Sequence, residues 1–256
     1  VCDTARVDIT VTAALVDAAD DDFSVPAIGP AGGTTASVLG NDSIQGAPVG
    51  VRPVNLSLTG VWPPGFAITP SGQIQVPGGT AAGVVVLAYQ LCEAASSNCD
   101  TANVRLVVEP AAASDSFTTP LGRALYGSVA VNDNVPAGAA YVVDGPVPPG
   151  LVLDPSGGFS YVPPSQFTGT ASFGYRVCLP APDNAVCATA GVSIDVTAGS
   201  VDATDDDFRG APVNPVTGGT TPSVLANDLH IDAAPPLPSD VILDLQGAPA
   251  GFTISA

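Results

Sequence analysis

Two long stretches of the chain alternate apolar and polar residues, and each is interrupted by a pair of cysteines. In the second stretch, Phe173, Tyr175 and Val177 alternate with small or polar residues, a period of two that buries one face of a β-strand. Both stretches are therefore predicted to be β-hairpins. The runs after the second cysteine alternate in the same way: Val104, Leu106 and Val108 in one stretch, and Val192, Ile194 and Val196 in the other.

The cysteines hold the same position in each predicted hairpin. The second cysteine of each pair lies five residues before the first inward valine of the run that follows. We predict that Cys92 pairs with Cys99 and Cys178 with Cys187, so that each disulfide staples its own hairpin and belongs in an oxidising compartment. Two thiols per cluster are too few for zinc, and no Cys-x-x-Cys spacing indicates redox chemistry. Cys2 precedes a similar alternating run and is predicted to pair outside this segment.

The hairpins belong to a larger repeat of about 90 residues. Phe23, Phe117 and Phe208 each follow an acidic or polar stretch and are 94 and then 91 residues apart. The Asn-Asp pairs that begin at positions 41, 132 and 227 are 91 and then 95 residues apart, so two independent landmarks agree. The predicted units are residues 1–16, the last strand of an upstream repeat; residues 17–109 and 110–200, two complete repeats; and residues 201–256, an incomplete repeat.

Each complete repeat is predicted to contain about seven short strands separated by Pro- and Gly-rich turns. That number of strands in just over ninety residues is typical of an immunoglobulin-like β-sandwich. The sequence therefore predicts an all-β fold of tandem immunoglobulin-like sandwiches arranged end to end. The predicted tight turns are Pro63–Gly65 and Pro70–Gly72 in the first repeat, and Pro148–Gly150 and Asp154–Gly157 in the second.

The composition excludes several classes of function. Six basic residues against 24 acidic ones give a net charge of −18, which repels nucleic acid and anionic lipid. No apolar run is long enough to span a membrane, so no membrane insertion is expected in this segment. One histidine, two glutamates and no lysine leave little for acid–base or nucleophilic catalysis, and the chain is predicted not to be an enzyme.

Two acidic stretches are candidates for binding calcium, which takes six to eight oxygen ligands. Both lie at predicted junctions between repeats, whereas the middle junction retains only Asp115. The alternative is that these aspartates are a solvated start of a strand, in which Asp21, Asp115 and Asp206 bond to a local turn. The candidate ligands are Asp17, Asp20, Asp21 and Asp22 at the first junction, and Asp202, Asp205, Asp206 and Asp207 at the last.

Aromatic residues and Asn-Asp pairs supply the remaining candidates. Tyr89 and Tyr175 occupy inward positions and are predicted to be core residues whose hydroxyls need a hydrogen-bond partner. Trp62 could stack on a sugar if exposed, or cover the end of the core if buried. The Asn-Asp pairs are predicted to form Asx turns that end the second strand of each repeat.

These motifs together resemble a known family. An acidic stretch leads into Phe23, and Val-Leu-Gly-Asn-Asp, Pro-Pro-Gly and Pro-Ser-Gly-Gln-Ile follow in order. This order is similar to that in the tandem immunoglobulin-like or cadherin-like repeats of large bacterial surface proteins of the fibrillar adhesin type. The resemblance implies an extracellular location at the bacterial cell surface, repeats that act mostly as spacers, and cadherin-type calcium at the junctions.

The sequence therefore predicts the structural repeat region of a bacterial extracellular fibre, stalk or filament. Its partners would be neighbouring repeats of the same chain or other copies in a filament. One alternative is an adhesin module that recognises a sugar or a host protein. Another is a pilus-like subunit that assembles by strand donation, because the chain begins with one strand and ends in an incomplete repeat. A window within a longer tandem array explains both ends more simply.

Overall fold

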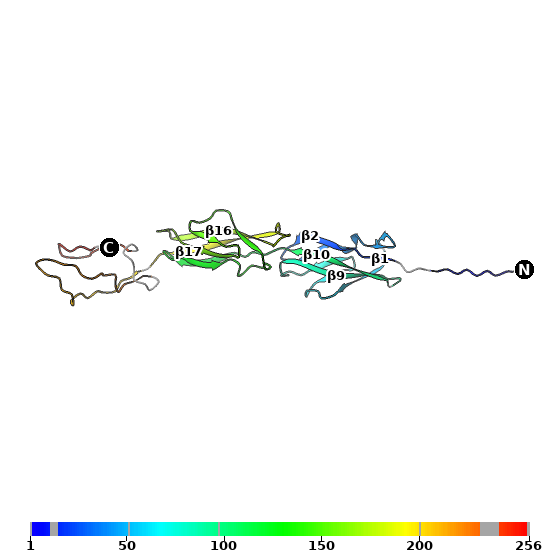
Figure 1. The fold of residues 1–256 in the computed structure, drawn as a ribbon, viewed down its shortest axis with the longest axis horizontal. Helices are drawn as coiled ribbons and strands as arrows, with labels where there is room; N and C mark the ends of the chain where they lie inside the picture. Colours follow the sequence, from blue (N-terminus) through cyan, green and yellow to red (C-terminus); the bar gives the residue numbers. More distant parts are fainter. Residues whose placement is uncertain are drawn as a thin grey trace.

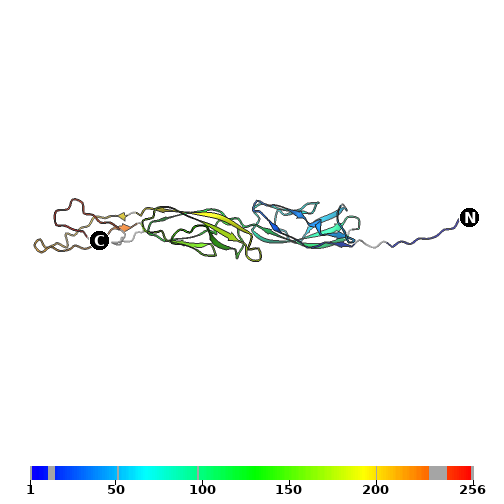
Figure 2. The same ribbon diagram turned by 90° about the horizontal axis from the view of Figure 1, so that it is seen from above.

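The computed structural model describes residues 2–10, 15–50, 52–96, 98–199, 201–230 and 241–254, without the side chain of residue 230. Two β-sandwiches lie end to end along one axis, as the two perpendicular views show (Figures 1 and 2). Residues 2–10 extend from one end and the segment after residue 200 lies at the other. The only helix among the described residues is a short 3-10 turn, η1 (Val38–Gly40), so the predicted all-β fold is confirmed.

The described strands follow the predicted order in both complete repeats. In the first they are β1 (Val16–Asp17), β2 (Asp21–Ile28), β3 (Gly33–Ser37), β4 (Ser43–Ile44), β5 (Ala47–Pro48), β6 (Val54–Thr59), β7 (Ala67–Ile68), β8 (Gln73–Val76), β9 (Gly83–Glu93) and β10 (Cys99–Val108). In the second they are β11 (Asp115–Pro120), β12 (Leu125–Ser128), β13 (Ala140–Asp144), β14 (Leu151–Leu153), β15 (Gly158–Tyr161), β16 (Gly169–Cys178) and β17 (Cys187–Thr197). The last segment contains β18 (Val201–Asp202) and β19 (Leu229–His230).

The first sandwich has one four-stranded sheet in the order β2-β10-β9-β6. It also has two three-stranded sheets, β3-β8-β7 and β1-β4-β5. β2 runs parallel to β10, whereas β9 and β10 form the predicted antiparallel hairpin. Alternation along the hairpin buries Tyr89, Leu91, Val104 and Leu106 completely, and these join Ile74 of β8 in one core. The predicted period of two therefore places the core correctly.

The second sandwich repeats this arrangement with sheets β11-β17-β16-β13 and β12-β15-β14. β11 is again parallel to the last strand, β17. Its core is more aromatic: the Phe159 ring lies edge-on to Phe117 and to Phe173, with centroids 4.9 and 5.9 Å apart. Such edge-to-face pairs add to the apolar burial of each ring.

The two outer segments differ from the complete repeats. Residues 2–10 form no strand, and Val7 and Ile9 are each 79% exposed; Val11 lies outside the described residues. A strand needs a neighbour for its backbone hydrogen bonds, and none lies beside this segment in the described chain. In the last segment β18 pairs with β19, as β1 pairs with β4 in the first sandwich. The domain limits given above, including the upstream strand at 1–16 and the incomplete repeat at 201–256, stay predictions.

The backbone at the Gly150 turn packs closely against the backbone of Val162. Gly150 has φ +86°, and an added Cβ would lie 2.2 Å from the Val162 oxygen, whereas Gly145 has φ +99° with open space around it. Gly145→Ala should cost about 1–2 kcal/mol from the left-handed backbone alone. Gly150→Ala should cost clearly more, because the backbone of Val162, whose nitrogen donates to the Gly150 oxygen at 3.0 Å, must also shift. Thermal unfolding of both variants checks this, and equal losses would contradict it.

Candidate functional site

An Asn-Asp clamp lies at the start of the first sandwich. Ser37 caps η1 by accepting a hydrogen bond from the Leu39 nitrogen at 3.2 Å, and the turn delivers Asp42 into the interior, where it is 2% exposed. Asp42 Oδ1 accepts a hydrogen bond from the Ala19 nitrogen at 2.8 Å. Asn41 Nδ2 donates to the backbone oxygen of Asp20 at 3.0 Å. The pair therefore fixes the segment through which the chain enters the sandwich.

The clamp recurs at each junction. The Ala113 nitrogen donates to Asp133 Oδ1 at 2.7 Å, and the Thr204 nitrogen donates to Asp228 Oδ1 at 2.7 Å. Asn132 and Asn227 donate to backbone oxygens of the same entering segments at 3.3 Å. The prediction of local Asx turns was therefore wrong. These side chains bond to residues about twenty positions earlier, because the fold brings the entering segment beside the end of the second strand.

A buried tyrosine lies beneath the clamp in both complete repeats. The Tyr89 hydroxyl donates to the Asp42 carboxylate, 2.9 Å from each oxygen, and the Tyr175 hydroxyl donates to Asp133 at 3.0 and 3.1 Å. Both tyrosines are 0% exposed, so their prediction as core residues is confirmed. Burial, followed by the neighbouring carboxylate, raises the pKa of each hydroxyl above its usual range, which keeps it a donor.

A second carboxyl group faces the clamp in each of the two complete repeats. Asp21 Oδ2 and Asp115 Oδ2 are buried and make no hydrogen bond among the described residues. Burial, with the charge of Asp42, raises the pKa of Asp21 to about 7. Burial and Asp133 likewise raise the pKa of Asp115. Two neighbouring carboxylates in this position cannot both ionise without cost, so the first clamp favours a protonated Asp21.

The sequence predicted that Asp21, Asp115 and Asp206, each two residues before a phenylalanine, bond to a local turn, and the structure corrects this prediction. The local bonds that the structure shows are instead made by Asp22 and Asp207, one residue after Asp21 and Asp206. Asp22 Oδ1 accepts from the Ser24 nitrogen at 2.9 Å, and Asp207 Oδ1 accepts from the Arg209 nitrogen at 3.0 Å. Alternation along β2 points Asp21 inward and Asp22 outward. Asp206 is exposed.

The first sandwich should become less stable as the pH rises from about 4 to about 7, and should change little from this cause above pH 7. A carboxyl with a pKa of 3.8 when unfolded and about 7 when folded contributes stability that is complete below pH 3.8 and is lost up to about pH 7. The slope cannot exceed about 1.4 kcal/mol per pH unit for one proton. Asp21→Asn should flatten it, whereas Asp8→Asn in the exposed leading segment should not. Urea unfolding between pH 4 and 8, followed by Trp62 fluorescence, measures this, and a wild-type slope of opposite sign would contradict it.

The acidic stretches do not gather their side chains at one point. Asp20 Oδ1 accepts from the Asn103 nitrogen at 2.8 Å, while Asp22 lies 3.5 Å from the Arg105 guanidinium. Asp207 pairs with Arg209 at 2.6 Å, Asp17 lies in β1 and Asp202 in β18. Across the described ranges, no three His, Cys, Asp or Glu side chains are arranged to hold a metal ion. Calcium at either stretch, with Asp205 and Asp206 among the ligands of the second, stays a prediction.

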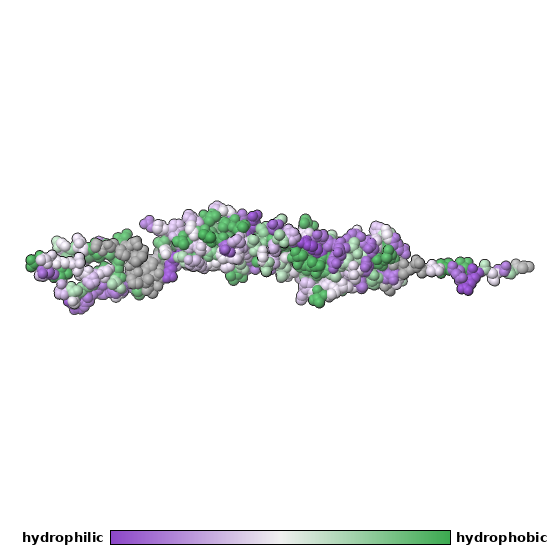
Figure 3. Space-filling view, viewed as in Figure 1, coloured by the Kyte–Doolittle hydropathy of each residue, from purple (hydrophilic) through white to green (hydrophobic). Residues whose placement is uncertain are grey.

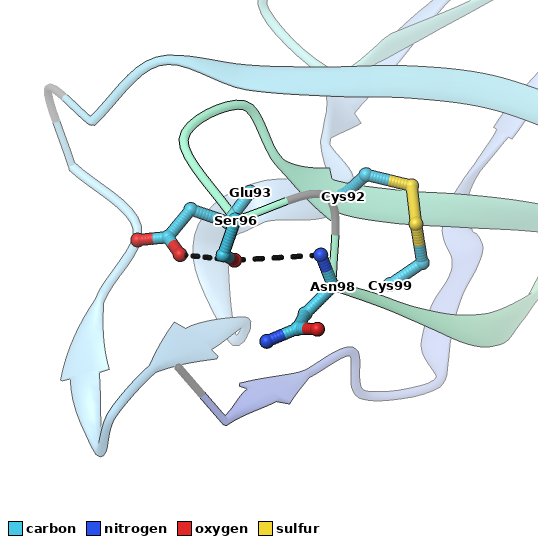
Figure 4. The surroundings of a disulfide bond; sticks show 5 residues. All are labelled: Cys92, Glu93, Ser96, Asn98 and Cys99. Atoms are coloured by element: carbon cyan, nitrogen blue, oxygen red, sulfur yellow. Dashed lines mark hydrogen bonds between the residues drawn. A yellow bond between two sulfur atoms is a disulfide. The ribbon is translucent and has the colours of Figure 1, made fainter. Parts of the chain in front are cut away.

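Both predicted disulfides are present. Cys92 and Cys99 face each other at the end of β9 and β10, and Cys178 and Cys187 do so at the end of β16 and β17. Each closes its own hairpin loop, and Figure 4 shows the first, in which Ser96 Oγ lies 2.5 Å from Glu93 Oε2 and accepts from the Asn98 nitrogen at 3.4 Å. Cys2 is exposed and in no disulfide here, so its pairing outside this segment stays a prediction.

Trp62 packs against the core of the first sandwich and is partly buried. Its indole nitrogen donates to the backbone oxygens of Thr59 and Ala88 at 3.1 and 3.0 Å. Its ring lies edge-on to Phe66 with the centroids 6.3 Å apart. Both polar and apolar parts of the side chain are therefore occupied within the domain. The structure also contains, over its described residues, no helix that could span a membrane.

The comparisons give a family match for the second repeat. Residues 108–197 match the family of bacterial Ig domains, and these limits enclose strands β11 to β17 together with their disulfide. The second repeat is therefore similar to the bacterial Ig domain over its whole length. The first sandwich has the same sheet order, clamp and hairpin disulfide as the second repeat. No curated protein matches the chain.

The chain is also similar, at low identity, to parts of several solved structures. The EC1–4 fragment of Drosophila N-cadherin is 12% identical over 73% of this chain and 50% of that one, with a TM-score of 0.30. An I-band fragment of titin is 12% identical over 77% and 69%, with a TM-score of 0.34. An endo-fucoidan hydrolase of glycoside hydrolase family 107 is 17% identical over 67% and 32%, with a TM-score of 0.24. This chain spans about half of the cadherin fragment, and none of these likenesses carries an argument about function.

The match to the family of bacterial Ig domains and the two disulfides determine the general assignment. The chain is an Ig-like region of a bacterial surface protein, and its disulfides indicate an extracellular or surface location. No feature of the described residues gives positive evidence of catalysis.

Proposed function

We propose that this region is a spacer in an extracellular fibre, stalk or filament at the bacterial cell surface. The observation that carries the proposal is the arrangement of two disulfide-stapled sandwiches along one axis (Figures 1 and 2). Strands of about ten residues that rise ~3.3 Å each give ~30–40 Å of reach per repeat. The net charge of −18 adds self-repulsion that favours an extended string.

The packing of the partly buried Trp62 supports the spacer over an adhesin module that recognises a sugar or host protein. An aromatic platform for a sugar needs an exposed ring face, whereas this indole has its hydrogen bonds and its packing inside the domain. The exposed apolar residues are distributed over both sandwiches in separate patches, which Figure 3 shows on one face. They include Val84 and Val86 in the first sandwich and Tyr126 and Val152 in the second.

The test measures reach and binding separately. One or two tandem copies of the 256-residue chain are displayed on cells between an anchor and a terminal epitope, and the height of the epitope is measured by fluorescence interference. The proposal predicts an added height of roughly 60–80 Å per copy from the two complete repeats. It also predicts no saturable binding of the purified chain to glycan or matrix-protein arrays. Saturable binding that Trp62→Phe abolishes would support the adhesin instead.

The partners of a spacer are other repeats. We propose neighbouring repeats of the same chain, or other copies in a filament, as the contacts of this region. Strand donation between subunits, as in a pilus, remains the alternative form of assembly. A calcium titration followed by calorimetry, with magnesium as control, tests whether the acidic junctions bind calcium as well.

A further inference from the structure

An arginine joins the two complete repeats. Arg105 lies on β10 of the first sandwich, and its Nη2 donates to both carboxylate oxygens of Asp183 in the second, at 2.8 and 2.7 Å. The side chains are only 29% and 13% exposed. Nη1 of Arg105 also lies 3.5 Å from Asp22 of its own sandwich. One guanidinium therefore contacts carboxylates from two repeats. Because the Arg105–Asp183 ion pair is bidentate and partly buried, salt screens it less than it screens an exposed ion pair.

Asp183 is presented by the stapled loop of the second sandwich. The loop between Cys178 and Cys187 is closed by the disulfide and by a bond from the Leu179 nitrogen to the Val186 oxygen at 3.0 Å. Within the loop, the backbone nitrogen of Asp183 donates to the Pro180 oxygen at 3.1 Å. The backbone oxygen of Asp183 accepts a hydrogen bond from the Val186 nitrogen at 2.9 Å. The staple therefore fixes the backbone that carries the carboxylate of Asp183.

A second contact crosses the same junction. Asn134 of the second sandwich donates through Nδ2 to the Thr80 oxygen at 3.0 Å and accepts through Oδ1 from the Ala82 nitrogen at 3.2 Å. Its backbone pairs with Ala111 in the connecting segment at 3.0 and 2.8 Å. Asn134, which belongs to the second sandwich, therefore contacts the first sandwich through its side-chain amide and the connecting segment through its backbone.

We propose that these contacts form a fixed joint between the first two repeats and that the Cys178–Cys187 loop is its latch, so that this disulfide controls inter-repeat bending. This joint rests on the proposed spacer function and explains how the two repeats of the spacer keep a fixed orientation relative to each other. The joint needs no metal ion, because Arg105 supplies the positive charge between Asp22 and Asp183. The Cys92–Cys99 loop takes no part in this joint, because β10 runs from Cys99 to Val108 and only its Val108 end leads into the connecting segment.

The test measures the distribution of distances between the two sandwiches in the whole chain. Spin labels are attached to ketone-bearing residues introduced at Val86 and Tyr126, which are 63% and 78% exposed, so the native cysteines stay intact. Double electron–electron resonance should give one narrow distribution. Asp183→Asn and the pair Cys178→Ser with Cys187→Ser should each broaden it at least twofold. The matched controls, Asp144→Asn and Cys92→Ser with Cys99→Ser, should leave its width unchanged, and so should a chelator.

Three results would overturn the joint: no broadening in Asp183→Asn, equal broadening when Cys92 and Cys99 are replaced, or broadening by the chelator alone. Circular dichroism checks that each variant is folded, and Asp183→Asn decides the outcome if the cysteine variant is not. A flexible joint would leave the spacer proposal standing, because flexible tandem repeats still add height. Saturable ligand binding would refute the spacer without affecting the joint.

Discussion

Asp42→Ala should lower the free energy of unfolding of the first sandwich by about 2–4 kcal/mol, because the Ala19 nitrogen loses its acceptor and the Tyr89 hydroxyl keeps only the longer bond to the Ala19 oxygen at 3.3 Å. An unsatisfied buried group costs about 1–3 kcal/mol, and two groups lose the Asp42 acceptor together. Relief of the repulsion with Asp21 offsets part of this cost at neutral pH.

The single tryptophan makes the measurement selective. Trp62 lies in the first sandwich, so urea unfolding followed by its fluorescence reports that domain alone. Asp42→Asn keeps an oxygen acceptor and should lose clearly less than Asp42→Ala. Equal losses in the two variants, or a loss below 1 kcal/mol in alanine, would mean that the clamp does not stabilise the fold.

Replacing Cys178 and Cys187 with serine should destabilise the second sandwich by about 2–3 kcal/mol. The disulfide joins residues nine positions apart, and closing so short a loop removes a modest amount of entropy from the unfolded chain. Differential scanning calorimetry should show a lower transition temperature for one domain, with the other unchanged. A loss above about 5 kcal/mol would indicate that the bond also supports packing between the sheets, against the local role assigned to it.

The alternating runs made the fold predictable from sequence. Phe173, Tyr175 and Val177 lie on the same face of their strand, so only that face can be buried. The equal spacing from the second cysteine to the first inward valine predicts the same strand register in both hairpins. The disulfides followed from this register without further information. Tyr89 and Tyr175 were placed in the core by the same argument.

The clamp was missed because its partners are distant in sequence. Aspartate is rarely buried, and nothing near Asp42 indicates that its partners are Ala19 and Tyr89. One signal was present: Asp21 and Phe23 are two residues apart in a strand and must share a face. Period-two alternation, applied to the acidic stretch as strictly as to the apolar runs, would have turned Asp21 inward. The contact of Arg105 with Asp183 joins different repeats and has no local pattern at all.

Force spectroscopy on the whole chain, pulled from its ends, tests the central claim that stapled repeats act as independent units of a mechanical string. The account predicts two unfolding events, each releasing roughly 240–250 Å of contour length: about 90 residues at ~3.4 Å each, less the ~30–40 Å reach of the folded repeat and the ~25–30 Å held inside its disulfide loop. Because the disulfides enclose separations of only seven and nine residues, reduction should lengthen each event by only about 25–30 Å. Extension without distinct events, or one event that releases both repeats together, would contradict the account.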